Sequence, residues 1–245
     1  MMNTNELSLE VAKRLTEIVN DAWADGSMLA EVTPITKELL KWWFSEEQCS
    51  IRKRNFHEGQ RQAILNIIYL HEVAKINTVT DRYDFVGEDL IARADLATLA
   101  KAKYQIPKYA VKMATGTGKT WVMHAMLLWQ MLNARHEDEP SGRFTKNFLI
   151  VAPGLIVYDR LLDAFCGRIK RGEEYRDFDT NDFVLNQDVF IPVHLRQEVF
   201  SFIQNNVVTK EEGIGKKATG DGMIALTNWH LFENQLADDD QQEDG

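Results

Sequence analysis

The fold is decided by one stretch of the chain, Tyr109-Ala-Val-Lys-Met-Ala-Thr-Gly-Thr-Gly-Lys-Thr-Trp-Val-Met-His124. A short apolar segment, 109–113, is followed by a glycine-rich turn and then by a run with helical spacing that continues from Lys119 to about Ala134. Gly116 and Gly118 let the backbone curl so that successive N–H groups point into one concavity, and the helix N-terminus adds partial positive charge. This strand, loop and helix unit predicts a binding site for a polyphosphate.

Residues 114–120 have the form AxxGxGKT, in which each residue type has a chemical role. The Lys119 ammonium would reach the β- and γ-phosphates of a nucleotide, and the Thr120 hydroxyl would ligate the Mg²⁺ that bridges them. Both are therefore also the catalytic candidates. The predicted phosphate and Mg²⁺ contacts in the loop are Thr115, Gly116, Thr117, Gly118, Lys119 and Thr120.

Further along the chain, apolar segments alternate with helical patterns. Residues 147–152 form a second buried-strand pattern, and a helix is expected over 155–165. Residues 189–193 and 223–227 are further candidate strands. Alternation of this kind predicts an α/β fold, a parallel sheet around a P-loop with helices on its faces.

The region before the loop has helical spacing for most of its length. We expect helices over residues 6–24, 36–44, 56–74 and 88–103, with a polar loop over 77–89. Residues 1–50 are interpreted as a helical N-terminal extension.

Composition limits the kind of surface that the chain can present. It has 245 residues with 28 Lys and Arg against 37 Asp and Glu, a formal charge of −9, which argues against a surface built wholly to hold nucleic acid. A local basic groove, with Lys216 and Lys217 in a glycine-rich loop, stays open, and any DNA affinity should be weak and salt-sensitive. Five acids lie among the last eight residues, so 238–245 are interpreted as an acidic disordered tail.

Two cysteines, Cys49 and Cys166, suggest neither a disulfide framework nor a zinc site. The first residues have no apolar signal region, and no stretch reaches the roughly 18 apolar residues of a membrane span. We expect a cytoplasmic protein.

Three segments together resemble a known family: Asn55-Phe-His-Glu-Gly-Gln-Arg-Gln-Ala-Ile64, Met113-Ala-Thr-Gly-Thr-Gly-Lys-Thr120 and Val151-Ala-Pro-Gly-Leu-Ile-Val-Tyr-Asp-Arg-Leu161. They are similar to the first RecA-like domain of superfamily 2 (DEAD/DEAH-box) helicases, and closest to the Res subunit of type III restriction enzymes. Met113 replaces the first glycine of the strict Walker A form, as is usual in helicase-like motors. The resemblance covers residues 36–236 and implies an incomplete first RecA-like domain over 51–237.

The resemblance implies roles for residues outside the loop. Gln60 matches the glutamine that reads the adenine edge, for which an amide with both a donor and an acceptor is suited, so ATP is the expected cofactor with Mg²⁺. Pro153, Gly154 and Arg160 match the segment placed against a nucleic-acid backbone, and Thr227 is a further candidate contact within Thr227-Asn-Trp-His230. An ordinary helix-surface glutamine, a strand-to-helix turn with a solvated arginine, and simple packing are the alternatives.

Hydrolysis needs an aspartate that holds Mg²⁺ and a glutamate that positions water at the end of a strand, and we find no convincing pair. Asp159 follows four apolar residues, but the helical spacing around it predicts a helix position, and Asp238–Asp240 lie in the polar tail. In the resembled family a DExH box, a second lobe and a nuclease domain come later. We therefore expect the front portion of a larger motor with negligible ATPase activity by itself.

The resulting hypothesis is an ATP-binding lobe whose intact parent couples ATP hydrolysis to movement on duplex DNA in defence against foreign DNA. A methyltransferase subunit of a restriction-modification system, or the remaining helicase and nuclease portion, would be the partner that the resemblance implies. Two alternatives stay open: a P-loop small-molecule kinase, and a non-catalytic fragment that binds a nucleotide or a partner.

Overall fold

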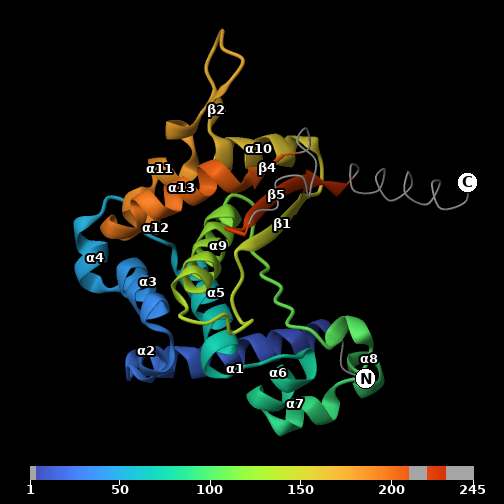
Figure 1. Cartoon of the computed structure of the whole chain (residues 1–245). Helices are drawn as coiled ribbons and strands as arrows, with labels where there is room; N and C mark the ends of the chain where they lie inside the picture. The colour runs from blue at the N-terminus through green and yellow to red at the C-terminus, as the bar shows by residue number, and fades with distance from the viewer. Residues whose placement is uncertain (1–3, 210–219, 230–245) are drawn as a thin grey trace, which may run out of the picture. The chain divides into compact units, whose positions relative to one another are not determined.

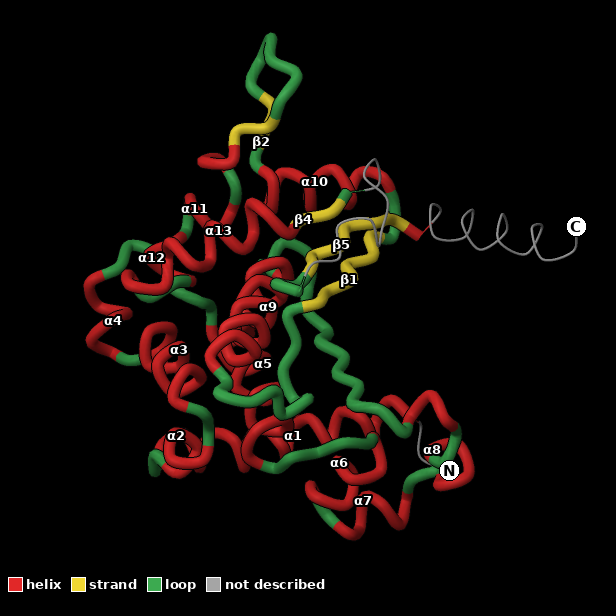
Figure 2. The backbone as a smooth tube through the Cα atoms, viewed as in Figure 1, coloured by secondary structure: helices red, strands yellow, loops and turns green. Residues whose placement is uncertain are grey.

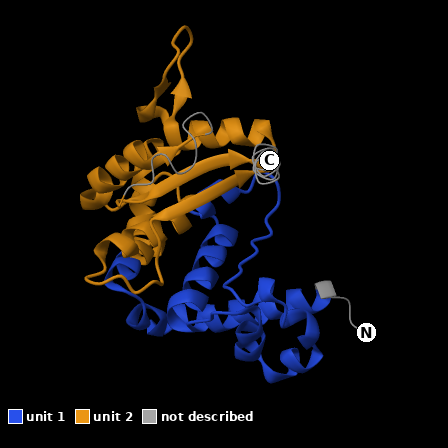
Figure 3. Cartoon of the chain, turned by 45° about the vertical axis from the view of Figure 1, so that its right-hand side comes forward, with its two compact units in different colours: residues 1–38, 56–123 blue, residues 39–55, 124–245 orange. Residues whose placement is uncertain are grey.

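A computed structural model of the chain describes residues 4–209 and 220–229, and its elements are mixed α and β (Figures 1 and 2). The chain divides into two compact units (Figure 3). Unit 1 contains residues 1–38 and 56–123, and unit 2 contains residues 39–55 and 124–245. The domain boundary at 50/51 stays a prediction. No helix in the described ranges is both long and apolar enough to cross a membrane.

Unit 1 is built from helices because its apolar residues recur at helical spacing. In α1, Leu7, Val11, Leu15 and Val19 are each four residues apart and buried, so they form one stripe along the helix. The helices of this unit are α1 (Thr4–Ala24), α2 (Ser27–Glu31), the start of α3 (Pro34–Phe44), α5 (Glu58–Ile68), the π-turn η1 (Tyr69–Val73), α6 (Val79–Val86), α7 (Glu88–Arg93), α8 (Leu96–Leu99) and the 3-10 turn η2 (Ala102–Tyr104).

The expected polar loop over 77–89 is wrong, because α6 occupies most of it. Thr78 and Asp81 form a capping box at its start, each side chain accepting a hydrogen bond from the other residue's backbone N–H. Val79, Tyr83 and Val86 are the buried face of this helix. The polar residues between them obscured a short helical pattern. The helix expected over 88–103 is instead broken into α7, α8 and η2.

The expected strand over 109–113 is also wrong. No ladder hydrogen bonds are found for these residues in the described structure, and Ala110, Val111 and Lys112 are exposed. An apolar run becomes a strand only where a neighbouring strand satisfies its backbone groups. Instead, the Arg82 guanidinium donates to the Lys108 carbonyl at 3.0 Å and ties the residue before this segment to α6.

Unit 2 contains the sheet, as the alternation of apolar segments predicts. Its strands are β1 (Asn147–Ala152), β5 (Met223–Asn228) and β4 (Val207–Val208), in the order β1-β5-β4 and all parallel. The strand predictions for 147–152 and 223–227 are confirmed. The burial expected for 147–152 is wrong, because β1 is an edge strand in which Leu149 and Val151 are 53% and 40% exposed. Helices α10 (Leu155–Cys166) and α13 (Arg196–Asn206) pack against the sheet, so the flanked parallel sheet is also confirmed.

The remaining elements of unit 2 are the end of α3, α4 (Glu46–Ile51), most of α9 (Lys119–His136), the antiparallel pair β2 (Arg168–Ile169) and β3 (Arg176–Asp177), η3 (Phe178–Thr180), α11 (Asp182–Leu185), α12 (Gln187–Phe190) and η4 (Val193–Leu195). The strand expected over 189–193 is wrong, since α12 and η4 occupy this run. Pro192 lacks the N–H that a ladder needs, and the Phe190 carbonyl instead accepts from the indole N–H of Trp43 at 2.9 Å.

The core of unit 2 includes an aromatic cluster around His124, which is completely buried. Its ring centroid lies 5.3 Å from that of Phe165, 4.3 Å from that of Phe183 and 5.6 Å from that of Phe190. Neither ring nitrogen has a hydrogen-bond partner among the described residues. Because burial penalises the charged imidazolium, the pKa of His124 falls to about 3. The imidazole is therefore neutral at physiological pH.

Candidate functional site

The glycine-rich turn forms the loop that its residue types predict, and it leads directly into α9. Gly116 and Gly118 have φ angles of 83° and 74°, the left-handed region that favours glycine. The hydroxyl of Thr117 donates to the carbonyl of Ala114 at 2.7 Å and tightens the turn. Thr115, Gly116 and Thr117 are exposed, so a ligand can reach this segment, in which the Thr117 N–H already donates to the Ala114 carbonyl at 3.4 Å.

Two charged or polar side chains follow at the start of α9. The ammonium of Lys119 donates to the Ala114 carbonyl at 2.9 Å, which folds the side chain back over the loop. An ammonium has three donors, so this contact leaves the group able to bind an anion as well. Thr120 is half-buried in the first turn. The loop thus brings together a cation, a helix N-terminus and a hydroxyl, the combination that a polyphosphate with a bound Mg²⁺ requires.

Gln60 lies in the wall of this loop and is 2% exposed. Its Nε2 donates to the carbonyls of Thr117 at 3.2 Å and Gly118 at 3.0 Å. Its Oε1 accepts from the backbone N–H of His57 at 2.7 Å, which closes the N-terminus of α5. A glutamine 57 positions earlier in the chain therefore fixes the position of the loop. Its contact with adenine stays a prediction.

An aromatic pair makes a second contact between the two motifs. The rings of Phe56 and Trp121 meet edge to face, with centroids 5.7 Å apart and planes at 80°. Phe56 immediately precedes the N-cap residue of α5, and Trp121 follows the Lys119-Thr120 pair. We did not predict this pair from the sequence. The signal that could have indicated it is an aromatic residue beside each of two motifs expected to share a site.

The residues expected to contact a nucleic-acid backbone lie in unit 2. In the β1–β5 register Val151 pairs with Thr227 and Ala152 with Asn228, so both strands end at the same edge. Pro153 is exposed and Gly154 is the N-cap of α10 at that edge, whereas Thr227 is only 3% exposed. Arg160 is an exposed residue of α10. The fold thus brings Pro153, Gly154 and Thr227 to one sheet edge, with Arg160 on the helix that follows.

The position of Asp159 in the middle of α10 is as predicted, which removes it as a strand-end carboxylate. The described part of β5 ends in Asn228, followed by Trp229. No group of three His, Cys, Asp or Glu residues that could hold a metal occurs within 4–209 and 220–229. Lys216, Lys217, His230 and the predicted tail over 238–245 lie outside the described residues.

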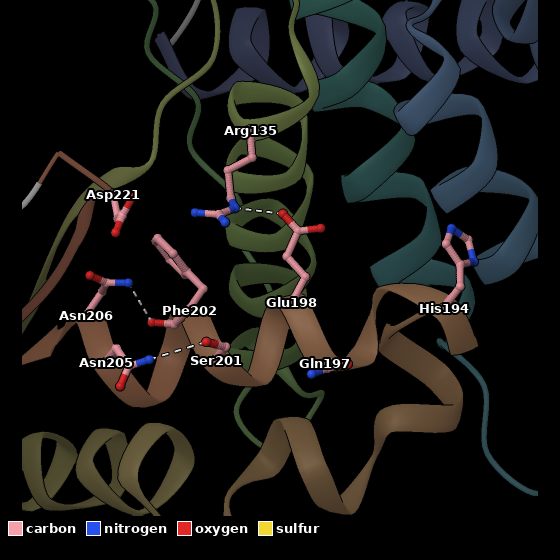
Figure 4. Close-up of a pocket in the computed structure, with 9 residues that line it drawn as sticks. All are labelled: Arg135, His194, Gln197, Glu198, Ser201, Phe202, Asn205, Asn206 and Asp221. Carbon is pink, nitrogen blue, oxygen red and sulfur yellow. Dashed lines mark hydrogen bonds and ion pairs between the residues drawn. The ribbon is translucent and has the colours of Figure 1, made fainter.

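A separate polar pocket of about 700 Å³ lies on α13 in unit 2 (Figure 4). Arg135 and Glu198 point toward each other across it, with 2.6 Å between Nε and Oε1. Burial raises the pKa of Glu198, but hydrogen bonds from Arg135 and His136 outweigh this effect and hold that pKa below its usual value. A carboxylate that stays ionised in this way is a poor proton donor. The pocket residues Gln197, Ser201 and Asn205 follow one another at helical spacing, the sequence signal for such a face.

Comparison with known proteins identifies a family. The sequence pattern of the family described as "Type III restriction enzyme, res subunit" matches residues 53–242, which is most of the chain and includes the loop, Gln60 and the sheet. No curated protein and no solved structure matches the chain.

Proposed function

The chain belongs to the family of type III restriction enzyme Res subunits, whose matched part is a superfamily 2 helicase N-terminal domain, and from this premise we propose that residues 114–120 bind Mg-ATP. The family is one of helicase-type ATP-binding domains, and ATP and Mg²⁺ are the cofactors that it uses in general. The observation that carries the proposal is the exposed loop with two left-handed glycines, directly followed by Lys119 at a helix N-terminus.

In the proposed complex the backbone N–H groups of the loop surround the phosphates. The Lys119 ammonium shifts from the Ala114 carbonyl toward the β- and γ-phosphate oxygens, because its attraction to an anionic oxygen is stronger than its attraction to a neutral carbonyl. The Thr120 hydroxyl ligates Mg²⁺. Gln60 keeps its two bonds to the loop, and the second lone pair of its Oε1 accepts from the adenine amino group.

The proposed use of this energy is movement on duplex DNA in the intact parent, in defence against foreign DNA. Pro153, Gly154, Arg160 and Thr227 would hold phosphates without reading bases, as a translocating protein needs. Arg160 is the exposed cation of this set, and Thr227 is the least accessible member. A methyltransferase subunit is the proposed source of sequence specificity.

We expect this chain to bind ATP but to have negligible ATPase activity by itself. Asp159 belongs to a helix, and β5 ends in Asn228, which is followed by Trp229, so neither position supplies an acidic pair that places water.

The test is a calorimetric titration of the full chain with Mg-ATP, repeated with Lys119→Ala. Lys112→Ala, an exposed lysine of the segment before the loop, is the matched control because it removes the same charge. Saturable binding that is lost in Lys119→Ala and kept in Lys112→Ala supports the proposal. Absence of binding in the unmodified chain, or equal binding in both variants, would count against it.

A further inference from the structure

Unit 2 contains a second pocket that no motif of the chain explains. It measures about 830 Å³. Its lining residues come from the end of α3, from α4 and the segment after it, and from the stretch between α11 and the start of α13. Its lining includes the exposed cations Lys53 and Arg54 and the apolar side chains Trp42, Ile51, Leu185 and Val193. We propose that this pocket docks an acidic, apolar peptide segment of a partner protein.

The pocket is positively charged. Four cations, Arg52, Lys53, Arg54 and Arg196, line the pocket against one carboxylate, Asp188, in a chain whose net charge is −9. Arg196 is already paired with Asp188 at 2.7 Å. The pocket is therefore a local positive region on an acidic protein, and it attracts a negatively charged partner.

Only some of these cations are available to bind a partner. Arg52 uses its donors within the fold, bonding the carbonyls of Gln48 at 2.9 Å, Trp43 at 3.1 Å and Val189 at 3.2 Å. Lys53 is exposed, and no described residue bonds its ammonium. Arg54 is exposed and donates through one nitrogen to Asn186 at 3.2 Å. Lys53 and Arg54 are thus two adjacent charges that face solvent, enough for one or two carboxylates.

The rim of the pocket is apolar, which favours a peptide over a nucleic acid as its ligand. Ile51, Leu185 and Val193 are 76%, 56% and 64% exposed. Aliphatic side chains give a leucine or phenylalanine a surface on which to bury area, whereas bases are held by aromatic faces and phosphates by longer rows of cations. The one large aromatic of the lining, Trp42, has the Arg52 guanidinium over its ring at 5.8 Å, so that contact occupies one face.

The test uses fluorescence anisotropy with the full chain and a fluorescein-labelled twelve-residue peptide in which Asp-Asp alternates with Leu-Phe. We expect saturable binding that weakens at least tenfold in Lys53→Glu/Arg54→Glu and several-fold in Ile51→Ser. Both changes are at exposed positions, so folding is retained and circular dichroism checks it. Lys41→Glu, an exposed lysine of α3 that does not line the pocket, is the control and leaves the affinity unchanged.

Three probes of equal length complete the experiment. Peptides with Asn for Asp, or with Ser for Leu and Phe, should bind at least tenfold more weakly, and a single-stranded oligonucleotide should not compete. Failure of the first peptide to bind, indifference to the double charge reversal, or equal competition by the oligonucleotide would overturn the proposal, the last in favour of a nucleic-acid site. Mg-ATP binding is measured in the same variants and should not change, so this proposal and the nucleotide proposal fail separately.

Discussion

The phosphate-binding loop and the aromatic cluster around His124 are stabilised in opposite ways. The loop is exposed, and its polar groups are held by hydrogen bonds from Gln60, Thr117 and Lys119 to backbone carbonyls. In the cluster, by contrast, a completely buried imidazole lies among three phenylalanine rings, with no hydrogen-bond partner in the described structure. Hydrogen bonds can be exchanged for bonds to a ligand, whereas buried contacts cannot. Ligand binding by the loop should therefore be sensitive to substitutions that remove a hydrogen-bond donor or change the backbone conformation. The stability of the cluster should be sensitive to a charge on the imidazole.

The largest expected effect is the loss of stability in acid caused by His124. Its pKa is about 3 in the folded state and about 6.5 when the side chain is solvated, so the unfolded state binds the proton first. The stability that the neutral ring contributes is fully present above pH 6.5 and is lost as the pH falls toward 3. This loss lowers the free energy of unfolding by at most about 5 kcal/mol. Urea unfolding of the chain and of His124→Leu between pH 7 and pH 4 measures it.

The comparison between these two proteins removes the effect of all other titrating groups. We expect the free energy of unfolding of the unmodified chain to fall more steeply below pH 6.5 than that of His124→Leu. Parallel curves would mean that the ring is hydrated or bonded in solution, and the contrast with the loop would then be lost.

The next effect should follow from Gly118→Ala. A Cβ atom at this position would overlap Nε2 of Gln60, and a φ of 74° is itself unfavourable for alanine. Loss of the left-handed geometry and of the two Gln60 bonds costs about 3 kcal/mol together, so Mg-ATP affinity should fall about 100-fold. Calorimetric titration measures the affinity.

Gly59→Ala is the matched control. Gly59 precedes Gln60 in helix α5, and a Cβ there meets nothing within 4 Å. It should raise the free energy of unfolding by up to about 1 kcal/mol and leave the ATP affinity unchanged. Equal Mg-ATP affinities of Gly118→Ala and Gly59→Ala would show that nucleotide binding does not depend on the observed shape of the loop.

A smaller effect is expected from Gln60, whose donor and acceptor can be separated. Gln60→Glu replaces the amide donor to Thr117 and Gly118 by an oxygen but keeps the acceptor for the His57 N–H. Losing these neutral, part-buried hydrogen bonds costs about 1 to 1.5 kcal/mol, so ATP affinity should fall about tenfold. Competition between ATP and GTP, measured in both proteins, tests the base. A variant that keeps full affinity and full preference for ATP would remove Gln60 from the site.

The smallest effect is expected from the edge-to-face pair. Phe56→Leu removes an aromatic contact with Trp121 worth about 0.5 to 1.5 kcal/mol. Thermal unfolding should detect this loss, while the affinity for Mg-ATP should change by less than about threefold because the loop bonds remain. An effect on ATP as large as that of Gly118→Ala would place the pair in the binding site itself.

A feature could be predicted from the sequence where its physical cause lies in neighbouring residues of the chain. The glycine-rich loop depends on residues within one turn of chain, so its prediction needed no distant contact. The apolar runs of β1 and β5 are strands because they pair with each other, whereas the similar run over 109–113 has no strand partner in the described structure. The run over 189–193 shows the limit, because a short apolar segment is equally compatible with a buried helix. Pro192 was the available signal against a strand.

The contacts that fix the site were less predictable because they join distant parts of the sequence. Gln60 could be selected by resemblance, but its bonds to Thr117 and Gly118 depend on the packing of unit 1. The burial of His124 likewise depends on three phenylalanines far from it in the sequence. Spacing along one segment carries no information about either arrangement.

The pairing of β1 with β5 also has a consequence during synthesis. The two strands are parallel neighbours, yet about half of unit 2 lies between them in the sequence. A ribosome therefore releases β1 well before its hydrogen-bonding neighbour exists, and the nascent chain carries an apolar, unpaired strand for that time. We expect the yield of native protein in a cell to depend on chaperones that shield this strand until translation has passed residue 228.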